Sequence, residues 1–180
     1  MGPSSRLAIE QNSGPNPNTA ITAALYVFGR DLRLDDHRGL AAAATLGTIV
    51  PGYIEDPGDR ARALNPRRAA YREAALGSLA AELAARGARL CIRRGPRAAV
   101  LVRLARELEV RTVVWSAGYG ARALARDRGL QAALEEAGLA VRIVHDAPAV
   151  SPEQIVAARA EDPGGYRSFA AFASAWEAQP

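Results

Sequence analysis

The sequence predicts an α/β fold: a five-stranded, parallel, doubly wound sheet of the Rossmann-like or flavodoxin-like kind, with helices on both faces. From residue 21 onward, short apolar and β-branched runs alternate with segments of helical periodicity, and Gly and Pro mark the ends of those segments. Strands separated by helices are joined by crossovers, which makes the strands parallel and covers both faces of the sheet. We expect the strand order 3-2-1-4-5.

Five apolar runs are the expected strands. They are Ala23–Phe28, Thr48–Ile54, Arg89–Ile92, Thr112–Trp115 and Val141–Val144. The segments between them carry leucines at helical spacing, which gives each segment one apolar face. These leucines are Leu76, Leu79 and Leu83, then Leu101, Leu104 and Leu108, then Leu130 and Leu134.

Local signals agree with these helices. Asn65-Pro66 and Gly95-Pro96 each place a cap before a proline at the first helical position. Gly87 and Gly138 follow helices where a left-handed residue is expected. The alternation of strand and helix therefore comes with the expected starts and stops.

The pattern changes after Val144. Residues 151–154, Ser-Pro-Glu-Gln, have the form of a capping box and predict a short helix over Ile155–Arg159. A loop is expected over Glu161–Gly165. Tyr166–Trp176 then repeats aromatic residues at helical spacing, and this stripe must be buried, either on the core or against a partner. Its members are Phe169, Phe172 and Trp176.

The chain divides into three segments. Residues 1–20 are rich in Ser, Asn, Pro and Gly, and we expect a disordered leader. Residues 21–150 form the α/β domain, and residues 151–180 form a helical extension of the same domain. A length of 180 residues with 49% hydrophobic and 23% charged residues is that of one soluble globular domain.

Composition also limits which cellular compartment and which kinds of partner are expected. No apolar run is long enough to span a bilayer, and no secretory signal is seen. The single Cys91 cannot form an internal disulfide and is expected in the core of a cytoplasmic protein. All 23 basic residues are arginine and the net charge is +4, but the arginines are interspersed with acids rather than concentrated on one element. Charge alone therefore does not predict nucleic-acid binding.

Ligands of an open parallel sheet bind beyond the carboxyl ends of its strands. The loops there carry Arg30, Arg33 and Arg94, which can grip a phosphate or carboxylate. A Walker motif is impossible without lysine, and no G-x-G-x-x-G follows the first strand. One Cys and two His far apart in the sequence give no metal-ligand spacing, so we expect no metal site. His37 and His145 are expected to be solvated or capping residues, and we assign no catalytic residue.

Three motifs resemble the DNA photolyase/cryptochrome family. Residues 26–36 resemble its opening W-F-R-R-D-L-R-L-x-D-N, with Arg30 to Leu34 identical. Residues 114–119 followed by Arg126-Asp127 are similar to V-x-W-N-x-x-Y-E-P…R-D, and residues 166–172 with Trp176 are similar to Y-x-V-F-T-P-F…W. The resemblance covers about residues 22–177 and implies the family's N-terminal, light-harvesting α/β domain.

The resemblance also implies what such a domain does. In the family it holds an antenna chromophore (a folate, a deazaflavin or FMN), and a separate helical domain binds FAD and DNA. The 180 residues hold no such FAD domain, so we expect a stand-alone domain without DNA-repair lyase activity of its own. The family's motif residues are replaced at Gly29, His37, Ser116, Gly120 and Ala170-Ala171. A retuned site makes folate the least expected ligand and favours FMN or a deazaflavin.

The expected site combines these observations. An Arg30–Asp31 ion pair would fix the first loop, and Asp36 would cap the first helix. Arg30, Arg33 and the Gly95-Pro96 helix start would face the polar end of the ligand, and Tyr119 would lie near its ring. The candidate cofactor-binding residues are Arg30, Asp31, Arg33, Glu55, Arg94, Gly95, Ser116 and Tyr119.

Two other functions stay open. The domain could be a ligand-free interaction module that forms a homodimer through its aromatic stripe, or docks to a separately encoded helical FAD-binding partner. Nucleotidyl transfer, known in related α/β folds, is the least supported because the phosphate motif is missing. Binding to DNA should be weak and strongly salt-dependent.

Overall fold

β1 (Ala23–Phe28) is the central strand of a five-stranded parallel sheet with the order β3-β2-β1-β4-β5. The computed structural model describes residues 23–58, 65–158 and 165–179, so the expected leader lies outside the described residues. The predicted α/β class and strand order are confirmed. The other strands are β2 (Thr48–Glu55), β3 (Cys91–Arg94), β4 (Thr112–Ser116) and β5 (Ala140–Val144).

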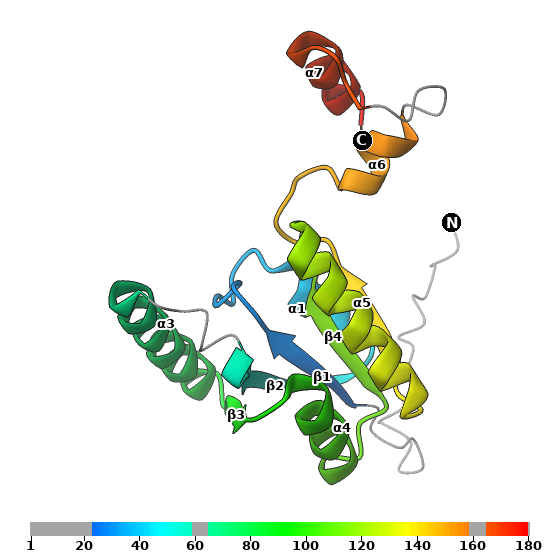
Figure 1. The fold of residues 1–180 in the computed structure, drawn as a ribbon. Helices are drawn as coiled ribbons and strands as arrows, with labels where there is room; N and C mark the ends of the chain where they lie inside the picture. Colours follow the sequence, from blue (N-terminus) through cyan, green and yellow to red (C-terminus); the bar gives the residue numbers. More distant parts are fainter. Residues whose placement is uncertain (1–22, 59–64, 159–164, 180) are drawn as a thin grey trace, which may run out of the picture.

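Helices cover both faces of this sheet (Figure 1). α1 (Arg38–Ala44) and α3 (Pro66–Ala85) pack on one face, where their apolar side chains meet Tyr26, Phe28 and Tyr53. α4 (Arg97–Glu107) and α5 (Ala121–Glu136) pack on the other. β1 is therefore apolar along its length, because it is buried from both sides.

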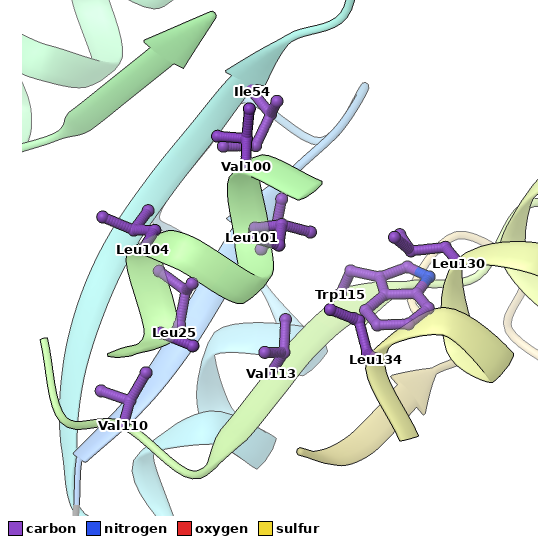
Figure 2. Close-up of a cluster of buried hydrophobic side chains, with 12 residues drawn as sticks. Leu25, Ile54, Val100, Leu101, Leu104, Val110, Val113, Trp115, Leu130 and Leu134 are labelled. Carbon is purple, nitrogen blue, oxygen red and sulfur yellow. The ribbon is translucent and has the colours of Figure 1, made fainter. Parts of the chain in front are cut away.

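The core under α4 and α5 is the larger of the two clusters (Figure 2). Leu101 and Leu104 of α4 are fully buried against Leu25 and Val113, and Trp115 lies beside Leu134 of α5. Each such leucine contributes about 1.5–3 kcal/mol relative to an exposed one. The leucine spacing in the sequence therefore correctly identified the buried helix faces, except that Leu108 ends up exposed just beyond α4.

Parallel register brings all the strand ends to one edge. β1 pairs with β2 from Ala23↔Thr48 to Phe28↔Tyr53 and with β4 on its other side. The chain reverses its winding direction between β1 and β4, which makes their carboxyl ends the switch point of the sheet. The loops after β1, β4 and β5 meet there.

β3 begins two residues later than the apolar run Arg89–Ile92 predicted. It pairs with β2 from Gly52↔Cys91 to Glu55↔Arg94, so Arg93 and Arg94 belong to the strand. β3 is an edge strand, and three of its four residues are exposed. Charged side chains are common on such edges because they discourage pairing with other chains, and an apolar pattern cannot locate a strand of this kind.

The predicted helix ends are largely confirmed. Asn65 caps α3 by accepting from Arg67 N at 2.9 Å, and Pro66 is the first helical residue. Gly87 and Gly138 have φ of +77° and +81° after α3 and α5. Pro96 differs: it is the N-cap of α4 and makes no side-chain cap, and Arg97 begins the helix.

The C-terminal segment forms α6 (Pro152–Ala157) and α7 (Phe169–Glu177). The capping box at Ser151 is confirmed, although the helix begins at Pro152 rather than Ile155 and the predicted end at Arg159 lies outside the described residues. Of the predicted loop Glu161–Gly165, residues 161–164 also lie outside them. Tyr166 donates a hydrogen bond to the carbonyl of Ile155 at 3.1 Å and joins the two helices. Figure 1 draws both helices beyond the carboxyl edge of the sheet.

The aromatic stripe of α7 is not buried, so its interpretation as a cover for the core is wrong. Phe169 is 81% exposed, Phe172 37% and Trp176 42%. The stripe instead lies on a helix that is remote from both sheet faces, with Phe172 against Tyr166 at 5.6 Å between ring centres.

Among the described helices, none combines the length and apolarity needed to span a membrane.

Candidate functional site

A buried polar cluster lies at the switch point, centred on the hydroxyl of Tyr26. β1 carries this side chain into the core, where it is fully buried. Its hydroxyl donates to Asp31 Oδ2 at 2.6 Å and lies 2.8 Å from Ser116 Oγ and 3.2 Å from His37 Nε2. A buried hydroxyl without partners would cost a few kcal/mol, so these contacts determine how the three loops meet.

Asp31 carries the negative charge of this cluster. Its Oδ1 accepts from Gly29 N at 2.7 Å, and its Oδ2 lies 3.1 Å from His37 Nε2. Burial acts to raise the pKa of the Asp31 carboxyl, but the hydrogen bonds from His37 and Tyr26 outweigh it and hold that pKa well below its usual range. Burial, with the nearby charge of Asp31, raises the pKa of the Tyr26 hydroxyl above its usual range.

His37, not Asp36, caps α1. Leu40 N donates to His37 Nδ1 at 3.3 Å, so Nδ1 is an acceptor and Nε2 is free to donate to Asp31. His37 is 5% exposed, which confirms the capping role and excludes the solvated one. Asp36 has a φ of +48°, and its carbonyl accepts from Arg33. The aspartate at this position therefore shapes the turn, and the histidine after it starts the helix.

Asp146, from the loop after β5, closes the cluster and was not predicted. Its Oδ1 accepts from Arg38 N at 2.7 Å, and its Oδ2 accepts from Arg33 Nη2 at 2.8 Å. Asp146 is 8% exposed, and its charge is compensated by Arg33 and by the first N–H group of α1, that of Arg38. The only signal for Asp146 in the sequence is that of a charged residue in the loop after a strand.

The predicted Arg30–Asp31 ion pair is wrong. Asp31 is turned inward to Tyr26 and His37, and Arg30 is exposed and makes no ion pair with the described residues. A buried carboxylate is compensated better by several fixed hydrogen bonds than by one mobile guanidinium. Arg30 therefore remains available at the surface.

Glu55, Arg94 and Gly95 form a second group, at the ends of β2 and β3. Arg94 Nε lies 2.5 Å from Glu55 Oε2, and Gly95 N donates to the Glu55 carbonyl at 3.1 Å. Asp56 Oδ2 accepts from Arg97 N at 3.0 Å at the start of α4. A carboxylate of the protein itself thus occupies the helix start that was expected to face a phosphate.

Tyr119 lies in the loop after β4, and its hydroxyl is 3.1 Å from His145 Nδ1 in the loop after β5. Asp127 of α5 holds this loop by accepting from Gly118 N at 2.9 Å, and Arg126 pairs with the same carboxylate. A Cβ on Gly118 would lie 2.4 Å from the Cβ of Ala123, so only glycine fits. The motif residues of this segment are therefore its loop scaffold.

Three side chains of the cluster have a spacing that a metal ion could use. One ligand atom each from Asp31, His37 and Asp146 lies within 4.8 Å of the others, an arrangement that the spacing in the sequence did not predict. In the structure the side chains of His37, Asp146 and Asp31 accept hydrogen bonds from Leu40, Arg38 and Tyr26, respectively. The donor set is thus satisfied internally, and the arrangement fits a structural network better than a metal centre.

A groove of about 660 Å³ lies elsewhere, between α4 and α5, and contains none of the predicted site residues. Its walls are Ala98, Ala99, Val102, Arg103, Arg106, Glu107 and Ala133. The strand-end rule and this groove disagree about where a ligand binds. We favour the strand ends, because polar groups from several loops converge there, whereas the charged residues of the groove, Arg103, Arg106 and Glu107, all come from one helix.

The fold and this edge define a doubly wound α/β domain with a polar switch point. Comparison with known proteins makes the assignment specific: residues 24–180 match the DNA photolyase family, and the chain belongs to that family. It is 36% identical over 163 residues to a deoxyribodipyrimidine photo-lyase of Halobacterium salinarum, covering 85% of this chain and 33% of the relative. A second such enzyme, from Synechococcus, is 31% identical, covering 87% of this chain and 32% of the relative.

Solved structures agree. A class III photolyase from Agrobacterium tumefaciens superposes with a TM-score of 0.77 at 26% identity, covering 93% of this chain and 34% of that protein. An archaeal photolyase from Sulfolobus tokodaii gives 0.68 at 24% identity, covering 85% and 34%, which supports the fold. The chain spans about a third of the length of these relatives.

Proposed function

We propose that this domain binds a flavin-type or nucleotide-type light-harvesting chromophore at the ends of β1, β4 and β5. The observation that carries the proposal is the convergence of Arg30, Arg33 and Tyr119 on loops that follow these strands, at the switch point where doubly wound sheets bind ligands. The Sulfolobus tokodaii relative was solved with two FAD molecules, with the implication of a novel light-harvesting cofactor. That relative supports a flavin over a folate.

The residues present fit such a ligand. Arg30 is exposed and without an ion pair among the described residues, so it can take a phosphate. Arg33 is held by Asp146, and 42% of its side chain is exposed, which makes it a fixed positive charge. Tyr119, half-buried beside His145, supplies an aromatic surface for a ring. The chromophore would absorb the light, and these residues would orient it.

Titration of FMN, a deazaflavin and AMP, followed by fluorescence or calorimetry, tests the proposal. We expect micromolar binding of a flavin, weakened about tenfold by Arg30→Ala, since a charge-assisted contact contributes about 1.5–3 kcal/mol and part of that is lost to solvent at an exposed site. Arg111→Ala removes another exposed arginine, directly before β4, and should change nothing. Absence of any binding below millimolar, or equal losses in the two variants, would overturn the proposal.

A second candidate function, that of an interaction module, has its own observation in the exposed stripe of α7. Phe169 and Trp176 offer an apolar face that stable monomers seldom leave uncovered. We propose that this face forms a homodimer, with a helical FAD-binding partner as the alternative occupant. Light scattering should show a dimer that Phe169→Ser with Trp176→Ser converts to monomer. A wild-type monomer at micromolar concentration would contradict the homodimer.

A further inference from the structure

The first half of α3 carries an exposed face of three arginines and one tyrosine, which no role in the fold accounts for. Arg67, Arg68 and Tyr71 are exposed and Arg72 is half-buried, and the buried residues of this helix begin only at Leu76. Tyr71 is 78% exposed, which is unusual for a large aromatic side chain. We call these four residues the arginine–tyrosine face.

Helical geometry places the four side chains together. Positions 67 and 71, and positions 68 and 72, are one turn apart, so all four lie within about 140° of the helix circumference. Neither acid of α3 neutralises them. Glu73 lies about 200° around the helix from Tyr71 at 100° per residue, and Glu82 pairs with Arg86 at 3.7 Å.

This arrangement is unfavourable for the helix by itself. Arg67 and Arg68 stand in the first turn, which holds no acid, where the helix dipole favours negative charge. Arg68 and Arg72 are a like-charged pair one turn apart, which also destabilises a helix. None of the three arginines forms an ion pair with the described residues, so no internal contact offsets these costs. A local rule broken without internal compensation points to an external partner.

We propose that the arginine–tyrosine face binds single-stranded nucleic acid, with the arginines on successive phosphates and Tyr71 stacked on an unpaired base. A polyanion relieves the repulsion among the arginines, and an exposed tyrosine ring offers a surface on which an unpaired base can stack. An acidic peptide would satisfy the arginines but not the exposed ring. None of these four residues belongs to the proposed chromophore site, so either proposal can fail without the other.

The experiment uses the full chain with fluorescein-labelled mixed-sequence DNA and RNA, single- and double-stranded, in anisotropy titrations over a range of salt concentrations. We expect single strands of either kind to bind more tightly than duplexes. The triple variant Arg67→Ala, Arg68→Ala, Arg72→Ala should reduce the magnitude of the slope of log K against log salt by about 2, because each lost phosphate contact accounts for about 0.7. The matched triple Arg89→Ala, Arg111→Ala, Arg128→Ala removes three other exposed arginines and should keep the slope.

Three further variants separate binding from folding. Tyr71→Ala should weaken single-strand binding roughly 5- to 150-fold, while Tyr71→Phe keeps it. Arg67→Glu with Arg68→Glu should abolish binding yet raise Tm by roughly 1–4 °C, because acids suit the first turn of a helix. Equal effects of the two arginine triples, an unchanged affinity in Tyr71→Ala, or preference for a poly-glutamate peptide over the oligonucleotides would each overturn the proposal.

Discussion

The two groups of charged residues at the carboxyl edge have similar composition and opposite surroundings. At the ends of β1, β4 and β5, Asp31 and Asp146 are almost wholly removed from water and their oxygens accept hydrogen bonds from fixed donors. At the ends of β2 and β3, Glu55 and Arg94 form one short ion pair, and the arginine side chain is 76% exposed. Asp31, Glu55 and Arg94 were all predicted as ligand contacts on the same grounds.

The difference shows that burial, more than residue type, decides what a strand-end charge does. A buried carboxylate must be satisfied in full and then fixes the backbone around it. An exposed pair is screened by water and contributes little to stability. The buried group is therefore the scaffold of the candidate site, and side chains still exposed beside it, such as Arg30, are the ones that can meet a ligand.

Asp31→Ala tests this contrast most strongly. The substitution leaves the hydroxyl of Tyr26, the imidazole of His37 and the Gly29 N–H without their acceptor. We expect a loss of about 3 kcal/mol in the free energy of unfolding, measured by urea denaturation. A loss below about 1 kcal/mol would mean that water replaces the carboxylate and that this group resembles the exposed one.

The same carboxyl predicts how stability depends on pH. Because the pKa of Asp31 is lower in the folded protein than in the unfolded chain, the unfolded chain binds more protons in acid. The contribution of Asp31 is complete above the ordinary Asp pKa of about 4 and is lost as the pH falls further. Wild type should lose stability more steeply than Asp31→Asn below about pH 5 in urea melts. If the stability of wild type and of Asp31→Asn fell in parallel with pH, the lowered pKa of Asp31 would be contradicted.

Gly39→Ala has a smaller expected effect and tests how tightly the buried group is packed. An added Cβ would lie 2.6 Å from the Tyr26 hydroxyl and 3.0 Å from Ser116 Oγ. We expect a net loss of about 1–2 kcal/mol, as overpacking exceeds the gain of up to about 1 kcal/mol in helix propensity. Gly77→Ala, on α3 with nothing within 4 Å of the new Cβ, is the matched control and should be stabilising. Similar Tm shifts in the two variants would show that α1 can move freely.

Arg94→Ala should have the smallest effect, below about 1 kcal/mol, since it removes an exposed pair. Raising the salt concentration should shrink even that difference, measured as the gap in urea midpoint between wild type and variant. A loss equal to that of Asp31→Ala would remove the distinction between the two groups.

The family motif of the first loop could be recognised from sequence, but its roles could not. Arg30 and Asp31 are adjacent and oppositely charged, which suggested a pair, yet the turn points one outward and the other to Tyr26. Capping was one of the two roles expected for His37, because a histidine next to a helix start can accept a hydrogen bond from a free N–H of the helix. Asp146 was missed because it comes more than 100 residues after its partners, and single residues at that separation leave no pattern.

The periodicity of apolar residues determined the number of strands, and the cap, Gly and Pro signals determined most helix ends, because alternation and capping are local properties of the chain. The strand order was expected from the doubly wound fold class, and the structure confirms it. It could not determine which charges are buried, since that depends on loops from distant strands arriving at the same edge. It also could not show that the aromatic stripe of α7 lies uncovered. The sequence of an amphipathic helix shows that the helix has an apolar face. Only the tertiary structure decides whether another surface of the same chain packs against that face.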